Sequence, residues 1–296
     1  MPRDKPNTKQ AMESKRNKRE RFARDGFCVF ENVLNIKEVG DLNDLSDGIL
    51  AKQDPSHFEE NRTTGSMVLI DWTMAGKYIK MAEFIAHPGA IEALGNLGFH
   101  DPKFGHGRII SKPPTSPPLF WHEDGRFWDD PVSYTPQPIQ VFLMYYLTNT
   151  TPKNGCLRVI PGSHLKRHTL HDMISPSHTK DLKTFAFPND PGFSRVEDEI
   201  DVPVKAGDLV IGYGSLLHAS HANQSNERRT VLTMWYYPDF VDLPDRTQAT
   251  VAMVEAKTGA ATLSGRAKAL MDPLRIAHDG DAEPIATQWI PGETLK

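Results

Sequence analysis

The sequence predicts a mainly β protein, a sandwich or a barrel with flanking helices. From Phe104 onward, short runs of β-branched and aromatic residues are separated by proline, glycine and asparagine, a pattern typical of these folds. Apolar residues with helical spacing occur instead before and after this region. The expected strands are 106–111, 119–124, 139–148, 156–160, 200–204, 208–213 and 229–237.

The segments around these strands supply the flanking elements. A long insertion at 164–199 has no clear periodicity. In chain order we expect a strand at 27–33, a helix at 36–51, a polar loop at 52–66 that is a candidate lid, a strand at 67–70, and helices at 81–97 and 249–271.

The chain is long enough for one large domain or two small ones. We expect residues 25–296 to form a single domain with a helical C-terminal extension, because this length suits one decorated β barrel. Residues 1–24 are rich in lysine and arginine, and we expect a basic N-terminal arm that includes a helix. Such charge runs are usually solvated faces, and a nuclear-localisation or anionic-surface role is the alternative.

Composition excludes several classes of protein. Hydrophobic residues make up 39% of the chain and charged residues 24%, which is too polar for a membrane protein. Because no apolar run approaches the roughly 18 residues that span a bilayer, and no secretory signal is visible, we expect a cytoplasmic protein. The net charge of −4 gives no nucleic-acid signal. Two cysteines, Cys28 and Cys156, make neither a disulfide framework nor a cysteine-based zinc site.

His122 and Asp124 are candidate metal ligands. Residues i and i+2 of a strand point to the same face, so this imidazole and this carboxylate can reach one ion. His218, far downstream, is the candidate third ligand, and its rival His221 has the opposite strand parity, whereas Ser220 shares its face. Two histidines and one carboxylate are the ligands of non-haem Fe(II) oxygenases, although zinc enzymes also use this set.

Arg229 bears on the identity of the metal. It begins a segment rich in β-branched and aromatic residues after a turn, so we expect it on a strand. A guanidinium inside a barrel would be a costly unpaired charge unless a ligand carboxylate pairs with it, and the distal carboxylate of 2-oxoglutarate is such a partner. Arg228 has the opposite parity, so one of the two arginines faces solvent if the other faces the barrel.

Several motifs occur in a fixed order along the chain. They are Arg-Asp-Gly-Phe at 24–27, Ile-Ser-Lys-Pro-Pro at 110–114, Trp-His-Glu-Asp at 121–124, Asn-Gly-Cys-Leu-Arg-Val-Ile-Pro-Gly-Ser-His at 154–164, Gly-Asp-Leu-Val at 207–210 and Leu-His-Ala-Ser at 217–220, followed by Asn223 and Arg229. With this ordered set the chain resembles the phytanoyl-CoA dioxygenase family of Fe(II)- and 2-oxoglutarate-dependent oxygenases from about residue 20 to about residue 240.

The resemblance implies a double-stranded β-helix, a cupin-like jelly-roll barrel flanked by helices. It also implies Fe(II), 2-oxoglutarate and O2 as cofactors, with His122, Asp124 and His218 as the catalytic metal ligands. The family places its 2-oxoglutarate arginine eleven residues after the last histidine, and 229 minus 218 gives that separation, which selects Arg229.

Other side chains near these motifs have two interpretations each. Ser220 is expected to donate its hydroxyl to 2-oxoglutarate, or else to be a turn residue. Met144 and Arg108 are candidates for contact with 2-oxoglutarate, but Met144 also fits a core stripe, and Arg108 could neutralise a substrate acid or form an outward salt bridge. The candidate substrate contacts near the mouth, which could equally be core residues, are Trp72, Phe127, Trp128 and Tyr134.

These expectations predict a 2-oxoglutarate-dependent dioxygenase. It would oxidise, most simply by hydroxylation, an unactivated C–H bond of a small natural-product-like or amino-acid-like molecule, with release of succinate and CO2. Neither a nucleic-acid partner nor a membrane partner is expected. Two alternatives are a zinc hydrolase on a cupin-like barrel, which has no use for an inward Arg229, and a non-catalytic binding protein that retains the fold.

Overall fold

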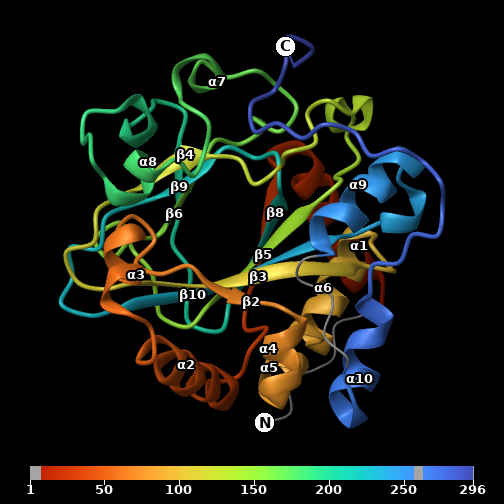
Figure 1. The fold of residues 1–296 in the computed structure, drawn as a ribbon, viewed down its shortest axis with the longest axis horizontal. Coiled ribbons are helices and arrows are strands. Elements are labelled where there is room, and N and C mark those ends of the chain that lie inside the picture. The colour runs from red at the N-terminus through yellow and green to blue at the C-terminus, as the bar shows by residue number, and fades with distance from the viewer. Residues whose placement is uncertain (1–7, 257–262, 296) are drawn as a thin grey trace.

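Two antiparallel sheets form the body of the protein in this computed structural model, which describes residues 8–256 and 263–295 (Figure 1). The larger sheet has the strand order β1 (Phe27–Phe30), β8 (Leu209–Tyr213), β5 (Val141–Tyr146), β10 (Arg229–Tyr237), β3 (Lys103–Lys112) and β2 (Val68–Ile70). The smaller sheet has the order β4 (Leu119–His122), β9 (His218–Ser220), β6 (Leu157–Val159) and β7 (Ile200–Val202).

The two sheets face each other across an interior lined by alternate residues of their strands. The ring of Phe142 on β5 lies 4.9 Å from the ring of His218 on β9, so the sheets are in contact through their inner faces. Every residue of β5 and of β10 is buried, because helices pack on the outer face of the larger sheet. The predicted mainly β architecture with flanking helices is therefore confirmed.

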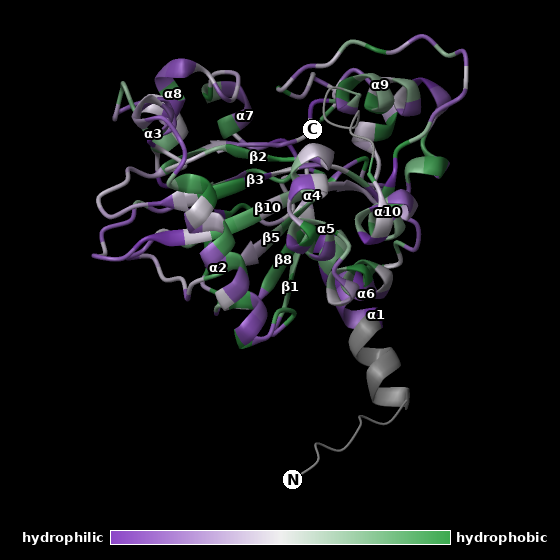
Figure 2. Ribbon diagram, turned by 60° about the horizontal axis from the view of Figure 1, so that its bottom comes forward, coloured by the Kyte–Doolittle hydropathy of each residue, from purple (hydrophilic) through white to green (hydrophobic). Residues whose placement is uncertain are grey.

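Most helices lie along the larger sheet (Figure 2). They bury their apolar faces in the same core as the strands, which leaves one side of the sheet free to line the interior. These helices are α1 (Thr8–Asp25), α2 (Ile36–Leu50), α4 (Trp72–Lys77), α5 (Ile79–Ile85), α6 (Pro88–Leu97) and α10 (Gly265–Met271). Asn35 begins α2 with a capping box, since its side chain accepts from Glu38 N and the Glu38 side chain accepts from Asn35 N.

Three predicted elements differ from the structure. The helix predicted at 81–97 is two helices, because Pro88 cannot continue α5 and instead begins α6. The loop predicted at 52–66 contains α3 (Pro55–Glu60), whose start is marked by the N-cap Asp54 and the proline that follows it. The helical stretch predicted at 249–271 is α9 (Asp245–Glu255) and α10, and part of the predicted stretch, 257–262, lies outside the described residues.

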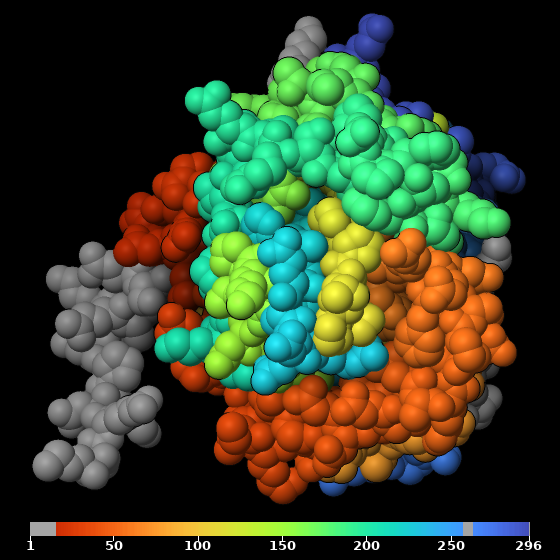
Figure 3. Space-filling model, turned by 90° about the vertical axis from the view of Figure 1, so that its left-hand side faces the viewer, coloured from red at the N-terminus to blue at the C-terminus, as the bar shows by residue number. Residues whose placement is uncertain are grey.

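The insertion at 164–199 covers part of the smaller sheet. It contains α7 (Leu170–Met173), α8 (Lys180–Thr184) and the 3-10 turn Pro191–Phe193, and that turn contacts β4. Figure 3 shows this insertion above three segments that lie side by side, around residues 115, 153 and 224. Three further 3-10 turns are Pro131–Tyr134, Phe240–Asp242 and Asp272–Leu274.

The described end of the basic N-terminal helix packs on the body of the protein. Phe22 is buried, and its ring stacks on Tyr213 of β8 at 4.7 Å between ring centroids. The division into an arm at 1–24 and a domain at 25–296 stays a prediction, although α1 continues without a break to Asp25. Among the described residues, no helix has both the length and the apolar character needed to cross a membrane.

Candidate active site

Three of the predicted residues meet where the smaller sheet borders the interior. His122 ends β4 and lies opposite His218 at the start of β9, because the two strands pair in that register. Asp124 follows β4, and its backbone N–H donates to Gly214 O at 2.7 Å. His122 Nε2 lies 3.6 Å from Asp124 Oδ1, and His218 Nε2 lies 3.6 Å from Asp124 Oδ2. All three side chains are buried, and Asp124 lies between the Nε2 atoms of the two histidines.

The hydrogen bonds of the two histidines fix which ring nitrogen faces Asp124. His122 Nδ1 is 3.0 Å from Phe120 O, and His218 Nδ1 is 2.9 Å from Leu216 O. A carbonyl only accepts, so each Nδ1 carries the proton and each Nε2 keeps its lone pair free for a metal. Burial, and then the neighbouring His218, hold the pKa of His122 well below its usual range, which also favours the neutral, metal-binding form.

Arg229 extends into the same interior from the start of β10. It is 3% exposed; its Nη2 is 3.4 Å from Ser220 Oγ, and its Nε has no hydrogen-bond partner among the described residues. Lys112 at the end of β3 is fully buried beside it, and its Nζ donates to Ser220 Oγ at 3.3 Å and to His221 O at 3.1 Å. Burial lowers the pKa of both cations, and Arg229 lowers that of Lys112 further.

Two buried cations without a carboxylate partner among the described residues make this end of the interior a site for an anion. A buried charge is costly unless it is paired, and a carboxylate ligand would pair with the fork of Arg229. Gly155, at φ +91°, belongs to the same site, since a Cβ there would lie 3.4 Å from Arg229 Nη2 and 3.1 Å from His221 O. The Asn154-Gly155 turn therefore lets the backbone pack against the guanidinium.

A cavity of about 490 Å³ opens beside the metal-ligand candidates. Its floor includes His122 and Asp124, and its walls come from β3, β10 and three segments outside the sheets. Those segments are 52–66, the insertion at 164–199 and the C-terminal tail. A hydrogen bond from Thr63 N to Lys183 O, at 3.1 Å, joins the first segment to the insertion. A cavity of this size fits a small organic molecule.

A comparison with protein families shows to which family the chain belongs. The model of the phytanoyl-CoA dioxygenase family matches residues 22–231, which contain all of the ordered motifs together with His122, Asp124, His218 and Arg229. The chain belongs to the phytanoyl-CoA dioxygenase family. This membership confirms the predicted enzyme class, a 2-oxoglutarate-dependent non-haem iron oxygenase, and with it the predicted cofactors Fe(II), 2-oxoglutarate and O2.

Curated members of the family align with parts of the chain or with most of it. Phytanoyl-CoA dioxygenase 1 of Oryza sativa subsp. japonica is 34% identical over 134 residues, which are 43% of this chain and 41% of the rice protein. The phytanoyl-CoA dioxygenase domain-containing protein 1 homolog of Caenorhabditis briggsae is 23% identical over 262 residues, 73% of this chain and 88% of that protein. The chain thus spans less than half of the rice relative's length.

Solved structures share the jelly-roll fold with this family member. The epimerase SnoN in complex with Fe3+, alpha ketoglutarate and nogalamycin RO has a TM-score of 0.57 at 18% identity, over 92% of this chain and 98% of that one. EctD from S. alaskensis, with 2-oxoglutarate and 5-hydroxyectoine, has a TM-score of 0.53 at 19% identity, over 80% of this chain and 78% of that one. At this level of identity the likeness establishes the fold.

A third histidine, His178, reaches the metal-ligand candidates of this family member from the insertion. Donor atoms of His122, Asp124 and His178 all lie within 4.8 Å of one another, so the structure offers two donor sets that share two residues. His218 is held in a paired strand, whereas His178 lies in a loop with a left-handed backbone at φ 65°. The strand-borne set has the more rigid framework, and His178 stands on the side of the cavity, 5.4 Å from the Trp289 ring.

The other predicted cofactor contacts face the interior. Ser220 lies between Arg229 and Lys112. Met144 is 7% exposed on the same face of β5 as Phe142, within the core, and accepts a hydrogen bond at its sulfur from Tyr146 Oη. Arg108 lines the cavity rather than forming an outward salt bridge, and its Nη1 donates to Gly107 O at 3.1 Å.

The predicted substrate contacts are not among the described residues that line the cavity. Trp72 begins α4 beneath the guanidinium of Arg275, at 4.2 Å from the ring centroid. Phe127 belongs to a second apolar cluster, Trp128 is 2% exposed, and Tyr134 Oη donates to Trp128 O at 2.8 Å. The aromatic side chains that line the cavity are instead those of Trp235 and Trp289.

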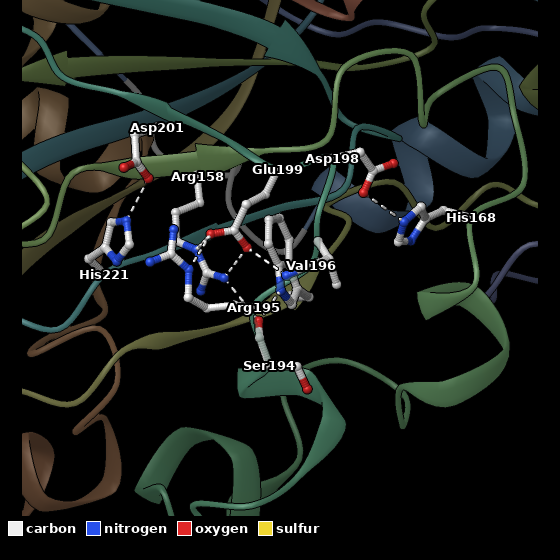
Figure 4. A network of polar contacts seen from close by, with 10 residues as sticks. Arg158, His168, Ser194, Arg195, Val196, Asp198, Glu199, Asp201 and His221 are labelled. Atoms are coloured by element: carbon white, nitrogen blue, oxygen red, sulfur yellow. Dashed lines mark hydrogen bonds and ion pairs between the residues drawn. The ribbon is translucent and has the colours of Figure 1, made fainter.

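An outer network ties the insertion to the strand that carries His122 (Figure 4). Arg158 and Glu199 form a buried ion pair, and Arg158 Nη2 also donates to Ser194 O at 2.9 Å. Trp121 Nε1 donates to the same carbonyl at 2.9 Å, and the Arg158 guanidinium lies 4.7 Å from the Trp121 ring centroid. These contacts hold Trp121 on the outer face while its neighbour His122 faces inward.

Sequence reasoning assigned no role to several residues of this site. Lys112 stands in the quoted Ile-Ser-Lys-Pro-Pro motif, and it shares strand parity with Arg108, so alternation could have identified it as inward. His178 and Trp289 lie in segments without periodicity, where the sequence gives no signal of direction. Arg126 also lines the cavity, and it lies two residues after Asp124, as Asp124 lies two residues after His122.

Proposed function

We propose that this protein hydroxylates a C–H bond of a small organic substrate, with Fe(II) bound by His122, Asp124 and His218. In the balanced reaction, one oxygen atom of O2 enters the alcohol and the other enters succinate, and 2-oxoglutarate loses CO2. The observation that carries the proposal is the buried pair Arg229 and Lys112, which has no carboxylate partner among the described residues and lies in the same interior as the histidines.

The side chains of the site match the ligands that Fe(II) and 2-oxoglutarate would require. Two imidazole Nε2 atoms and one carboxylate occupy one side of an ion and leave neighbouring positions for other ligands, as Fe(II) oxygenases require. A dicarboxylate that reaches from these positions to Arg229 would neutralise the buried guanidinium with a bidentate pair. Lys112 and the Ser220 hydroxyl would hold the same carboxylate from its other sides.

The chain's own groups have distinct roles in this proposal. The hydrogen bonds from Nδ1 of His122 and His218 to backbone carbonyls keep both rings oriented through the reaction. The cavity walls would hold the substrate carbon beside His122 and Asp124. When bound, the iron and 2-oxoglutarate supply, with O2, the oxidant that removes the hydrogen atom.

The test is anaerobic addition of Fe(II) and 2-oxoglutarate to purified protein, with detection of the weak visible charge-transfer band that a metal-bound 2-oxo acid produces. We expect the band in the wild type, its loss in Asp124→Ala, and a large increase in the 2-oxoglutarate concentration required in Arg229→Gln. Arg228→Gln is the matched control, because Arg228 is exposed and its Nη1 donates to Ser111 O instead.

A zinc hydrolase would give the opposite result. The protein would retain zinc on purification, form no band with Fe(II) and 2-oxoglutarate, and respond equally to Arg228→Gln and Arg229→Gln. That outcome would exclude the oxygenase proposal for this chain, because the buried arginine would then have no dicarboxylate to bind.

A further inference from the structure

We infer that the substrate carries an oxyanion group, a carboxylate or a phosphate, which Arg108 and Arg126 bind within the cavity beside the metal site. This inference rests on the proposed function, because it concerns the molecule that the same site oxidises. It names the class of that molecule: a small anion with an apolar portion.

Arg108 presents its charge to the cavity from the inner face of β3. It alternates with His106 and Ile110, which also line the cavity, so the strand directs the guanidinium inward. Its Nη1 donates to the neighbouring carbonyl of Gly107, and among the described residues it forms no ion pair. An arginine held inside a cavity with most of its donors unused is suited to bind a ligand with several acceptor oxygens.

Arg126 presents a second guanidinium to the same cavity. Its Nε is buried and has no hydrogen-bond partner among the described residues, and its guanidinium lies 5.3 Å from the ring centroid of Trp289. Gln288 N donates to Arg126 O at 2.9 Å, so the C-terminal tail holds this arginine and Trp289 together. An unpaired buried donor of a charged group is costly, and an oxyanion would satisfy it.

The charges around the cavity favour an anion. Arg108, Arg126 and Lys183 all line it, whereas Asp124 is the one acidic residue in the described lining, and the proposed metal would neutralise it. Glu255, the nearby carboxylate whose charge acts on both arginines, accepts hydrogen bonds from Tyr237 Oη at 2.8 Å and contacts His106 at 3.0 Å. A cavity with this excess of positive charge attracts anions and disfavours cations.

The anion inferred here is distinct from 2-oxoglutarate. Arg229 and Lys112, the proposed partners of the cosubstrate, do not line the cavity that Arg108 and Arg126 line. Part of the remaining wall is apolar or aromatic and includes Met67, Leu119 and Trp235, while Asn61, Thr64 and Gln140 add polar groups. These walls suit an apolar body attached to the anionic group, which would direct that body towards His122 and Asp124.

The test measures binding of three matched probes to the anaerobic Fe(II)–2-oxoglutarate complex by equilibrium dialysis: 3-phenylpropionate, phenyl phosphate and the neutral 3-phenylpropanamide. Saturating 2-oxoglutarate keeps Arg229 occupied. We expect at least one of the anions to bind at least about tenfold more tightly than the amide, since a hydrogen bond to a charged group commonly contributes a factor of ten or more. Comparison of 3-phenylpropionate with phenyl phosphate shows whether the site prefers a carboxylate or a phosphate.

Arg108→Gln and Arg126→Gln should each reduce the preference for the anions about tenfold while affinity for the amide stays unchanged. Arg266→Gln is the matched control, because Arg266 is 71% exposed on α10 and pairs with Glu83 outside the cavity. Equal binding of anions and amide, or an equal effect of Arg266→Gln, would overturn the inference. So would weakened 2-oxoglutarate binding in both cavity variants with unchanged probe binding.

Failure of this inference is separable from failure of the proposed function. The charge-transfer band is recorded on the same samples before the probes are added. A normal band with no anion preference rejects the anionic substrate and keeps the oxygenase. A missing band rejects the oxygenase, and anion binding to the metal-free protein then shows whether the two arginines bind an oxyanion on their own.

Discussion

The indole Nε1 of Trp235 donates a 2.8 Å hydrogen bond to Asp124 Oδ2, the carboxylate oxygen that lies 3.6 Å from His218 Nε2. Trp235 is on β10 in the larger sheet, whereas Asp124 follows β4 in the smaller one. This contact therefore joins the two sheets at the proposed metal site. Because Arg229 and Trp235 share strand parity, one strand carries both the proposed anchor for 2-oxoglutarate and the group that orients the carboxylate.

Trp235→Phe should weaken iron binding without removing a ligand. The substitution deletes the donor to Asp124 and leaves the carboxylate free to rotate, and loss of such an outer hydrogen bond typically costs about 10- to 100-fold in metal affinity. Competition with a coloured chelator measures the effect. Trp72→Phe is the control, because it shortens another buried indole outside the cavity. Equal iron affinity in Trp235→Phe and the wild type would contradict a role for the indole in orienting Asp124.

Iron should remain bound in His178→Ala and be lost in His218→Ala. Both histidines are near Asp124, but His218 is fixed by strand pairing and by its Nδ1 hydrogen bond, whereas His178 is held in the insertion. Iron content after dialysis decides between the two donor sets. His221→Ala is a matched control, since His221 faces outward and its Nε2 lies 2.6 Å from Asp201 Oδ1. Loss of iron in His178→Ala with retention in His218→Ala would assign the other set.

Lys112→Met should stabilise the protein in the absence of 2-oxoglutarate, by about 1 kcal/mol or more at pH 7. The substitution replaces a buried ammonium beside Arg229 with an apolar chain of similar length, and such replacements are often stabilising. Urea unfolding measures the change. The same variant should bind 2-oxoglutarate about tenfold more weakly, because the distal carboxylate loses one charged donor. Lys166→Met, at an exposed lysine, controls for the loss of a surface charge.

The stabilisation gained by Lys112→Met should decrease as pH rises from 7 to 9. Burial holds the pKa of Lys112 well below the 10.5 expected for the unfolded chain, so between these two values the unfolded state binds more protons than the folded state. The wild type consequently gains stability as pH rises towards 10.5, and Lys112→Met lacks this gain. The advantage of the variant should be smaller at pH 9 than at pH 7. A variant that is less stable at both pH values would mean that Lys112 is stabilised by its contacts despite its burial.

Strand parity explains how much of the site is predictable from sequence. It distinguishes His218 from His221 and shows that only one of Arg228 and Arg229 can face the interior, and the family's separation then selects Arg229. In the structure His221 contacts Asp201 and Arg228 donates to Ser111 O. Parity applies because β9 and β10 have one face towards the interior, so a shift by one residue would reverse every side chain.

Contacts between distant segments are not predictable in the same way. Parity directs Trp235 inward, but its bond to Asp124 depends on how the two sheets are spaced. Trp289 reaches the cavity because the tail bonds to the backbone of Arg126, and His178 because the insertion folds over β4. These segments have no periodicity, so nothing in their sequence gives a direction. Phe127, predicted as a substrate contact, is near the metal motif in sequence, and its side chain packs in an apolar cluster.

Glu199→Gln should lower the free energy of unfolding by about 3 kcal/mol at pH 7, because it leaves the buried Arg158 without its counter-charge. Chemical denaturation measures the loss. Glu197→Gln is the matched control, since Glu197 is an exposed carboxylate two residues away. The substitution should also disturb the candidate active site. Arg158 and Trp121 both donate hydrogen bonds to Ser194 O, and Trp121 directly precedes His122.

The loss of unfolding free energy caused by Glu199→Gln should also disappear in acid. Burial alone would raise the pKa of Glu199, but hydrogen bonds from Arg158 and from Val196 N lower it below its usual value of 4.5. A carboxylate with a lowered pKa stabilises the fold above its unfolded pKa, and this stabilisation is lost as pH falls through the folded value. The wild type and the variant should therefore converge in stability as pH falls below 4.5. A difference that stays constant from pH 7 to pH 3 would show that Glu199 acts through its shape and hydrogen bonds, because its charge would then contribute nothing.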